Sequence, residues 1–399
     1  MNAFTRTILS QRDSLRRTEI LTILEAICQR LELTATQFDR AKVAYGAVGE
    51  WLCQGQHPLL AAAMIDLHGS GALGTSVRPI CKAEFDVDLI CFLATAPATL
   101  APAEAKRLVG DRLKEHAGYA KILEPKKRCW RLNYAGDFHL DISPTIANPR
   151  CSSGGQLVPD RDLRAWHPTN PPGYRDLFRR RAALQPRLWV PKADRQLEAQ
   201  VAPFPEQQVV KGILRRTVQL LKRHRDVHFL AIPGEVAPIS IVITTLAMRA
   251  YEACVLNRTF ADELEVMVEA IRMMPAFIER YYDRSGREHY AIWNETTSGE
   301  NFAERWNSEP QRVEAFYAWQ AKALADFEAL RDAVGEDTIA KRLREPFGDH
   351  VVNPVIDART EAISSARTSD RLLVAPAVGL TLTPSAPATA VPKNVFFGD

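Results

Sequence analysis

Apolar side chains recur at steps of three and four residues over the first fifty positions of the chain, which is the spacing of one face of an α-helix. The pattern runs from about 14 to 33 and again from about 36 to 52, where Thr36 is the residue expected to cap the second helix. Two long amphipathic helices are therefore predicted at the start of the chain. The apolar positions are Ile20, Leu21, Ile23, Leu24, Ile27, Phe38, Ala41, Ala44, Tyr45, Val48 and Leu52.

From Leu67 the pattern changes from helical to alternating. The stretch HGSGALGTS brings three glycines within six positions, and EFDVDLICFL then alternates between polar and apolar side chains. We expect a glycine-rich turn that leads, after a short connection, into a half-buried strand. A helix is predicted over about 103–116, and RCWRLNY and DFHLDIS are typical of two strands joined by a turn at Ala135-Gly136. This part of the chain thus mixes strands with helices.

The second half of the chain is predicted to be mainly helical. Residues 150–205 are rich in Pro, Gly and Arg, and we place the connection between two lobes at about 190–206. From about 207 to 334 nearly every segment has helical spacing, and PISIVITTLAMRAYEAC is apolar nearly all round, which indicates a buried helix. The predicted units are a core over 1–200, a helical lobe over 201–375 and a poorly ordered tail over 376–399.

Composition narrows the class of protein. A chain of 399 residues is long enough for two lobes, and 51 Lys+Arg against 48 Asp+Glu leaves a formal charge of +3. This balance excludes disordered, collagen-like and strongly polycationic proteins, although a local basic groove fits it. We expect a cytoplasmic protein with no membrane contact, since no window of 18 apolar residues occurs and the N-terminus is charged. Seven cysteines without a CxxC pair indicate reduced thiols and no structural zinc.

The candidate chemistry begins with two aspartates on one predicted strand. In a strand, successive side chains point to opposite faces, so Asp86 and Asp88 project from the same side. Carboxylates about 7 Å apart on one strand repel each other, which is tolerable in water or around cations. If the predicted strand DFHLDIS neighbours the first, Asp141 completes a three-carboxylate cluster. Asp137 is the competing candidate, and a solvated polar edge is the alternative interpretation of the whole pattern.

A candidate phosphate holder lies upstream of the aspartates. Gly69 and Ser70 allow backbone N–H groups and a hydroxyl to approach phosphate oxygens closely. The signal alone is weak, because glycine-rich turns are common and this one lacks the GxxxxGK[ST] pattern of a Walker loop. Followed by Asp86, Asp88 and Asp141, it becomes specific.

In this order HGSGALGTS, EFDVDLICF and FHLDISP resemble the active-site signature of the polymerase-β-like nucleotidyltransferase superfamily. The longer context is similar to the bacterial cyclic-oligonucleotide synthases (CD-NTases), relatives of animal cyclic GMP-AMP synthase. The resemblance runs from about Thr36 to Trp306, through GTSVRPICKAEFDVDLI, LRRTVQLLKRHRD, PISIVITTLA and ENFAERW. It implies a bilobal α+β fold, with a nucleotidyltransferase core of a mixed sheet flanked by helices and a mainly helical second lobe.

The resemblance also implies roles for single residues. Asp86 and Asp88 would hold two Mg²⁺ ions, for which Mn²⁺ can substitute, and Asp141 would bind the ion that lowers the pKa of the acceptor hydroxyl. Ser70 and the Gly69 backbone would grip the donor triphosphate. On the second lobe it implies a phosphate-contacting Lys222 and a hydroxyl at Ser240.

Other conspicuous side chains have plainer interpretations. Lys211 and Arg215 share a helix side with Lys222, so that side can face the cleft or solvent. A structural role is expected for His139 and a surface position for His224. The run 179–181 is a charged helix face or a recruiting patch for an acidic partner. Trp293, Trp306 and Trp319 are expected in the helical core.

The function implied is a synthase that joins nucleoside triphosphates such as ATP or GTP into a cyclic di- or trinucleotide second messenger. The resemblance places it in bacterial anti-phage (CBASS) signalling, with a product-sensing effector as partner and no DNA activation. The alternatives are a template-independent RNA, tRNA or protein nucleotidyltransferase, and an inactive nucleotide-binding sensor, against which the intact aspartates argue. The C-terminal tail is a candidate for attachment by a ubiquitin-transfer-like enzyme, although Asp399 follows the Gly398 that such chemistry would use.

Overall fold

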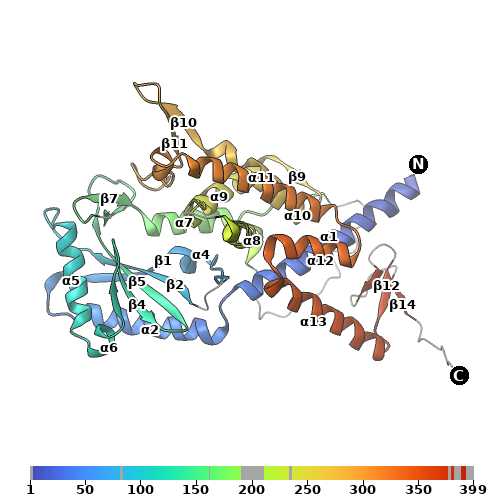
Figure 1. The fold of residues 1–399 in the computed structure, drawn as a ribbon, viewed down its shortest axis with the longest axis horizontal. Helices are drawn as coiled ribbons and strands as arrows, with labels where there is room; N and C mark the ends of the chain where they lie inside the picture. The colour runs from blue at the N-terminus through green and yellow to red at the C-terminus, as the bar shows by residue number, and fades with distance from the viewer. Residues whose placement is uncertain are drawn as a thin grey trace.

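The computed structural model describes residues 3–80, 84–160, 162–189, 211–232, 236–375, 379–381 and 388–391. Strands gather in one lobe and long helices in the other (Figure 1). The predicted bilobal α+β fold, with a mixed sheet flanked by helices and a helical second lobe, is confirmed. None of the described helices combines the length and the apolar character that a membrane span requires.

The first lobe is built on a seven-stranded sheet. Five strands follow the order β1-β2-β5-β4-β3, β6 pairs with β5, and β7 pairs with β6. Strand β2 runs parallel to β5 and antiparallel to β1, and β4 and β5 form the predicted hairpin. The strands are β1 (Ala63–His68), β2 (Phe85–Leu93), β3 (Leu123–Pro125), β4 (Trp130–Tyr134), β5 (Phe138–Ala147), β6 (Gln156–Pro159) and β7 (Trp166–Thr169). The edge strand β1 was not expected from the sequence.

Helices close one apolar core of this lobe. Helices α2 (Ala35–Cys53) and α5 (Pro102–Lys114) share it with the inward-facing side chains of β2 and β5. Short helices α3 (Pro58–Ala61), α4 (Gly69–Leu73) and α6 (Ala117–Ala120) connect the strands. The cap of α2 differs from the prediction, because Thr34 takes this position in place of Thr36. The Thr34 hydroxyl accepts from the Gln37 backbone while the Gln37 side chain accepts from the Thr34 backbone, which is a capping box.

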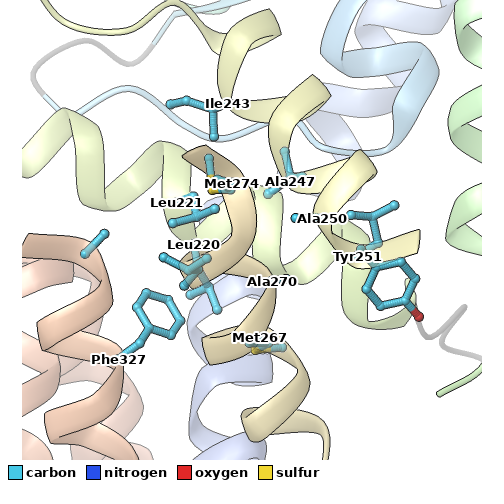
Figure 2. Packing of buried hydrophobic residues seen from close by; sticks show 14 of the residues in the cluster. Leu220, Leu221, Ile243, Ala247, Ala250, Tyr251, Met267, Ala270, Met274 and Phe327 are labelled. Carbon is cyan, nitrogen blue, oxygen red and sulfur yellow. The ribbon is translucent and has the colours of Figure 1, made fainter. Parts of the chain in front are cut away.

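The second lobe is a bundle around its own apolar core. Figure 2 shows side chains of α8, α9 and α11 pointing into it, among them Leu220, Ala247 and Phe327. The helices are α8 (Gly212–His228), η3 (Phe229–Ala231), α9 (Ser240–Asn257), α10 (Glu263–Met273), η4 (Met274–Phe277), η5 (Glu304–Asn307), α11 (Gln311–Arg331), α12 (Glu336–Phe347) and α13 (Asp349–Thr368). Helix α9 is buried on nearly every turn, as its apolar sequence predicted.

The expectation that this lobe is almost entirely helical was wrong for two segments. Strands β10 (Glu279–Tyr282) and β11 (Glu288–Ala291) form an antiparallel hairpin that projects from the lobe in Figure 1. Its turn is fixed by Asp283, whose carboxylate accepts from Ser285 and Arg287 backbone N–H groups, and by Gly286 at φ 79°. A second, parallel pair joins β8 (Arg187–Leu188) and β9 (Thr259–Phe260).

Packing divides the chain differently from the predicted boundary at residue 200. Helix α1 (Ala3–Leu31) and helix α7 (Pro171–Ala182) contribute Ile20, Ile27 and Phe178, all fully buried, to the core of the helical lobe. The predicted connection at 190–206 lies outside the described residues. Near the C-terminus, β12 (Leu373–Ala375) pairs with β13 (Gly379–Thr381) and with β14 (Thr389–Ala390), so part of the expected disordered tail is a strand. The six cysteines that the structure describes are free thiols.

Candidate active site

Three aspartates converge on one face of the sheet. Along β2 the apolar side chains of Phe85, Val87 and Leu89 are buried, which turns Asp86 and Asp88 to the opposite face. The parallel register of β2 and β5 places Asp88 directly opposite Asp141. The expected cluster of Asp86, Asp88 and Asp141 is therefore present. The competing candidate Asp137 lies at the hairpin turn and pairs with Arg40.

The glycine-rich segment lies against this cluster. It forms the short helix α4 and not the expected open turn, and Gly69 begins it with φ 62°. A Cβ atom at this position would stand 2.1 Å from Oδ2 of Asp88, so only glycine allows the backbone to approach the carboxylate so closely. The Ser70 hydroxyl lies 3.2 Å from that of Ser76. The Gly-Ser and Asp-x-Asp motifs, which follow each other in the sequence, are thus in contact in the structure.

A cleft of about 1560 Å³ opens between the two lobes at this point. Six of the seven predicted site residues line it: Gly69, Ser70, Asp86, Asp88, Lys222 and Ser240. The seventh, Asp141, lies one strand further along the sheet and is not part of the lining. The structure therefore brings both lobes and nearly all the predicted residues to one cavity.

Burial shifts the pKa values of the charged groups in the cleft. The pKa of Asp88 rises to about 7, first because the carboxyl is buried and then because Asp141 and Asp86 repel its charge. The pKa of Lys222 falls to about 8, chiefly because its ammonium is buried. That ammonium donates to the backbone oxygen and the hydroxyl of Thr75, each at 3.2 Å. Lys222 thus reaches from the helical lobe into the loop behind Ser70.

The sequence reasoning missed Arg131, which lies against the aspartates. Its Nε donates to Oδ1 of Asp141 at 2.6 Å, and one terminal nitrogen donates to Oδ2 of Asp141 at 2.7 Å and to Oδ1 of Asp86 at 3.0 Å. Strand pairing between β4 and β5 places Arg131 directly opposite Asp141. Both strands were predicted, but a two-residue turn at Ala135-Gly136 would pair Arg131 with Leu140, and only the three-residue loop 135–137 of the structure pairs it with Asp141.

The donor set of the cluster fits a hard divalent cation. All three side chains offer carboxylate oxygens, which Mg²⁺ prefers, and their mutual repulsion would be relieved by a bound cation. Within the described part of the chain, however, no group of three acidic, His or Cys side chains is already arranged around a metal position. The guanidinium of Arg131 supplies the positive charge beside Asp141 and Asp86.

The remaining predicted residues are divided between the cleft and the lobe contacts. Ser240 begins α9, and its hydroxyl lies 3.4 Å from a nitrogen of Arg225, a cleft residue that the sequence did not single out. Lys211 pairs instead with Glu32, which directly follows α1. Arg215 donates to the Leu73 backbone at the end of α4, so the shared helix side supports the glycine-rich segment.

Two of the plainer interpretations were wrong. His224 is buried, not on the surface: its Nε2 lies 3.0 Å from Asp326, and its Nδ1 lies 3.0 Å from the indole nitrogen of Trp319. Trp293 lines the cleft and bonds to Glu279 outside the helical core, whereas Trp306 and Trp319 are buried there as expected. His139 pairs with Glu84, which fits the structural role predicted for it.

Comparisons with known proteins agree with this architecture. Residues 19–181 match the Second Messenger Oligonucleotide or Dinucleotide Synthetase domain (SMODS). The c-di-GMP synthase of Roseivirga ehrenbergii is 27% identical over 385 residues, which are 96% of this chain and 98% of that protein.

Two solved structures share the fold across the chain. The Bradyrhizobium diazoefficiens CD-NTase CdnG, in complex with GTP, aligns with a TM-score of 0.64 at 20% identity and covers 86% of this chain and 98% of its own. CdnC of E. coli MS115-1 with ATP aligns with a TM-score of 0.56 at 15% identity and covers 81% and 96%. The resemblance to the bacterial CD-NTases is thus confirmed.

Replacing Gly69 with Ala tests the close approach to Asp88. We expect the free energy of unfolding to fall by more than about 1–2 kcal/mol, the cost of a left-handed residue, because the carboxylate must also move. Affinity for a non-hydrolysable nucleoside triphosphate should fall by about tenfold or more, as calorimetric titration would measure.

Gly136→Ala is the matched control. Gly136 has φ 78°, but an added Cβ would meet nothing within 4 Å. This variant should lose stability without losing nucleotide affinity. Equal affinity losses in both variants would contradict the assignment of Gly69 to the nucleotide site.

Proposed function

We propose that this relative of the CD-NTases joins nucleoside triphosphates into a cyclic dinucleotide or trinucleotide with release of pyrophosphate. The observation that carries the proposal is the meeting of Asp86, Asp88, the Gly69–Ser70 segment and Lys222 at one cleft between the lobes, with Asp141 opposite Asp88 on the neighbouring strand. Its volume of about 1560 Å³ exceeds the ~300–1,000 Å³ of ordinary ligand pockets, which suits two nucleotides at once.

The chemistry asks the protein mainly to position and neutralise its substrates. Bound Mg²⁺, or Mn²⁺ in its place, would supply the positive charge that activates the attacking hydroxyl and stabilises the leaving pyrophosphate. Asp86 and Asp88 would hold the two ions, and Asp141 would act on the acceptor side. We assign the donor triphosphate to the Gly69 backbone, the Ser70 hydroxyl and Lys222.

Ser240 is the second hydroxyl that we assign to phosphate. It begins α9 at the cleft and lies beside Arg225, which also lines the cavity. A hydroxyl that is fixed next to a guanidinium suits a phosphate oxygen, because the pair offers two donors in a sheltered site. Both lobes would therefore grip the same nucleotide.

The relatives suggest which nucleoside triphosphate to test first. The Roseivirga relative is named c-di-GMP synthase, and the CdnG structure holds GTP. We therefore propose GTP as the first substrate to supply. An RNA- or protein-modifying transferase on the same core remains the second candidate, and it is distinguished by its product.

The purified protein with Mg²⁺ and the four nucleoside triphosphates should release pyrophosphate and form a product that resists phosphatase. Chromatography after omission of each triphosphate in turn identifies the bases. The double variant D86N/D88N should form no product, because amides neither neutralise nor hold divalent cations as carboxylates do. Its circular dichroism and melting temperature are the control for folding.

Linear extension of an RNA primer as the only product would favour the second candidate. Unchanged product formation by D86N/D88N would overturn the assignment of the aspartates. An inactive sensor would bind triphosphates with no pyrophosphate release in either protein.

A second prediction concerns Lys222, whose side chain is only 5% exposed. Its pKa is lowered to about 8, so holding the ammonium inside the protein costs stability at every pH below about 8. This cost declines as the pH rises from 8 toward the usual pKa of lysine. We therefore expect Lys222→Met to lower product formation at least about tenfold while its melting temperature at pH 7 equals or exceeds that of the parent.

Melting curves of both proteins from pH 6 to pH 10 give the test. The parent protein should gain stability relative to Lys222→Met only above pH 8. A variant that melts earlier but keeps full activity would mean that Lys222 serves the lobe contact with Thr75 and not the phosphate.

We further propose a role in anti-phage (CBASS) signalling, in the cytoplasm, with an effector that senses the product. The proposal is supported by the relation to second-messenger synthetases and awaits a biological test. Cells that carry the gene with its neighbours should survive phage infection better than cells that carry D86N/D88N. The proposed attachment of the tail by a ubiquitin-transfer-like enzyme concerns residues outside those described, and mass spectrometry of the co-expressed protein would detect it.

A further inference from the structure

We infer that Arg131 is the resting counter-ion of the aspartate cluster and competes with divalent cations for Asp141 and Asp86. This inference rests on the proposed metal-dependent function, because it concerns the same aspartates before a nucleotide binds. Arg131 would make the empty site a poor metal binder and would yield its place when a nucleotide brings the metal in.

The hydrogen bonds of Arg131 cover the atoms that a metal would need. Both carboxylate oxygens of Asp141 accept from the guanidinium, at 2.6 and 2.7 Å, and one oxygen of Asp86 accepts at 3.0 Å. Such two-pronged contacts between arginine and carboxylate are among the strongest charged hydrogen bonds in proteins. A metal ion that binds through the same lone pairs of these oxygens must break the hydrogen bonds of Arg131.

The contact between Arg131 and Asp141 is also largely shielded from solvent. The side chains of Arg131 and Asp141 are 21% and 16% exposed, whereas Asp86 is 59% exposed. The pair with Asp141 is therefore sheltered from water, and the pair with Asp86 is the weaker one. Since arginine keeps its charge at any pH of interest, Arg131 competes without a change in its own protonation.

The backbone limits how Arg131 can leave. Because Arg131 and Asp141 are opposite each other in the β4–β5 ladder, their Cα atoms cannot separate without breaking the sheet. Only the guanidinium can move, by rotation of its own side chain. A guanidinium released in this way would stay beside the cluster, within reach of the anionic triphosphate that arrives with the metal.

The competition has a consequence that a purely structural arginine would not have. Removing Arg131 leaves Asp141 and Asp86 without their hydrogen-bonded cation and Lys222 as the remaining positive charge near Asp88, which lowers stability when no metal is present. The same change frees Asp141 and Asp86 for a metal ion. Stability and metal affinity should thus move in opposite directions.

The competition is tested by titrating the whole protein with Mn²⁺ in the absence of nucleotide. The electron paramagnetic resonance signal of the free ion reports how much Mn²⁺ is bound. Arg131→Met should bind Mn²⁺ at least about tenfold more tightly than the parent, since the competing charge is gone. Its melting temperature should be lower without metal and should rise on addition of Mg²⁺ more than that of the parent. Unchanged or weaker Mn²⁺ binding would overturn the inference.

Arg40→Met is the matched control, because it removes an arginine from Asp137 at the turn of the same hairpin. Its Mn²⁺ affinity should equal that of the parent. The double variant R131M/D141N should lose most of the gain, because the freed carboxylate is then absent. If R131M retains its full gain in this background, Arg131 does not act through Asp141.

If Arg131→Met fails to fold, Arg131→Lys serves in its place. Lysine keeps the charge but loses the two-pronged contact, so Mn²⁺ affinity should rise by a smaller factor, and no rise would overturn the inference. Failure of the proposed function is a separate result: a protein that makes no cyclic nucleotide can still show tighter Mn²⁺ binding in R131M. Conversely, if the parent protein forms product and R131M binds Mn²⁺ no more tightly than the parent, the counter-ion role of Arg131 is rejected while the proposed function stands.

Discussion

The parallel register between β2 and β5 is the constraint on which the site depends, because it sets Asp88 opposite Asp141. The register is held by apolar side chains such as Val87, Leu89 and Leu140, which are buried on the other face. A slip by one residue would turn all of them toward the cleft, so burial of the core enforces convergence of the carboxylates. Hydrophobic packing in this way sustains an arrangement of like charges that electrostatics alone would disperse.

The helical lobe completes the site by holding the loop that follows α4. Besides the contact of Lys222 with Thr75, Gln219 of α8 donates to the Ser76 backbone at 3.0 Å. The next turn of the loop is tied to α1, since the Arg78 backbone N–H donates to Leu31 at 2.8 Å. Because α1 packs on α8, one body of helices positions the glycine-rich segment from behind. A movement of the helical lobe would therefore shift the glycine-rich segment, to which we assigned the donor triphosphate.

The sequence was sufficient wherever local periodicity decides the structure. Strand alternation predicted the common face of Asp86 and Asp88, and the order of motifs predicted Asp141. Periodicity does not say which lobe a helix joins, so α1 was assigned to the wrong core. It also does not say whether a polar residue is buried, since His224 owes its position to Asp326, which lies 102 residues further on. Such pairings depend on tertiary contacts between distant segments of the chain.

Arg131 lies between these two cases and explains how the cluster is stable before substrate binds. Its strand was predicted, but its pairing with Asp141 depends on a loop one residue longer than the predicted turn, and its importance emerges only from the charges around it. Asp88 makes no hydrogen bond to the guanidinium and faces the cleft, and its pKa of about 7 reflects burial and the nearby carboxylates. Arg131 thus compensates Asp141 and Asp86 through hydrogen bonds, whereas Asp88 has only the longer-range charges of Arg131 and Lys222 to offset its own. A cation held at Asp88 would weaken, by its charge, the hold of Arg131 on the other two carboxylates.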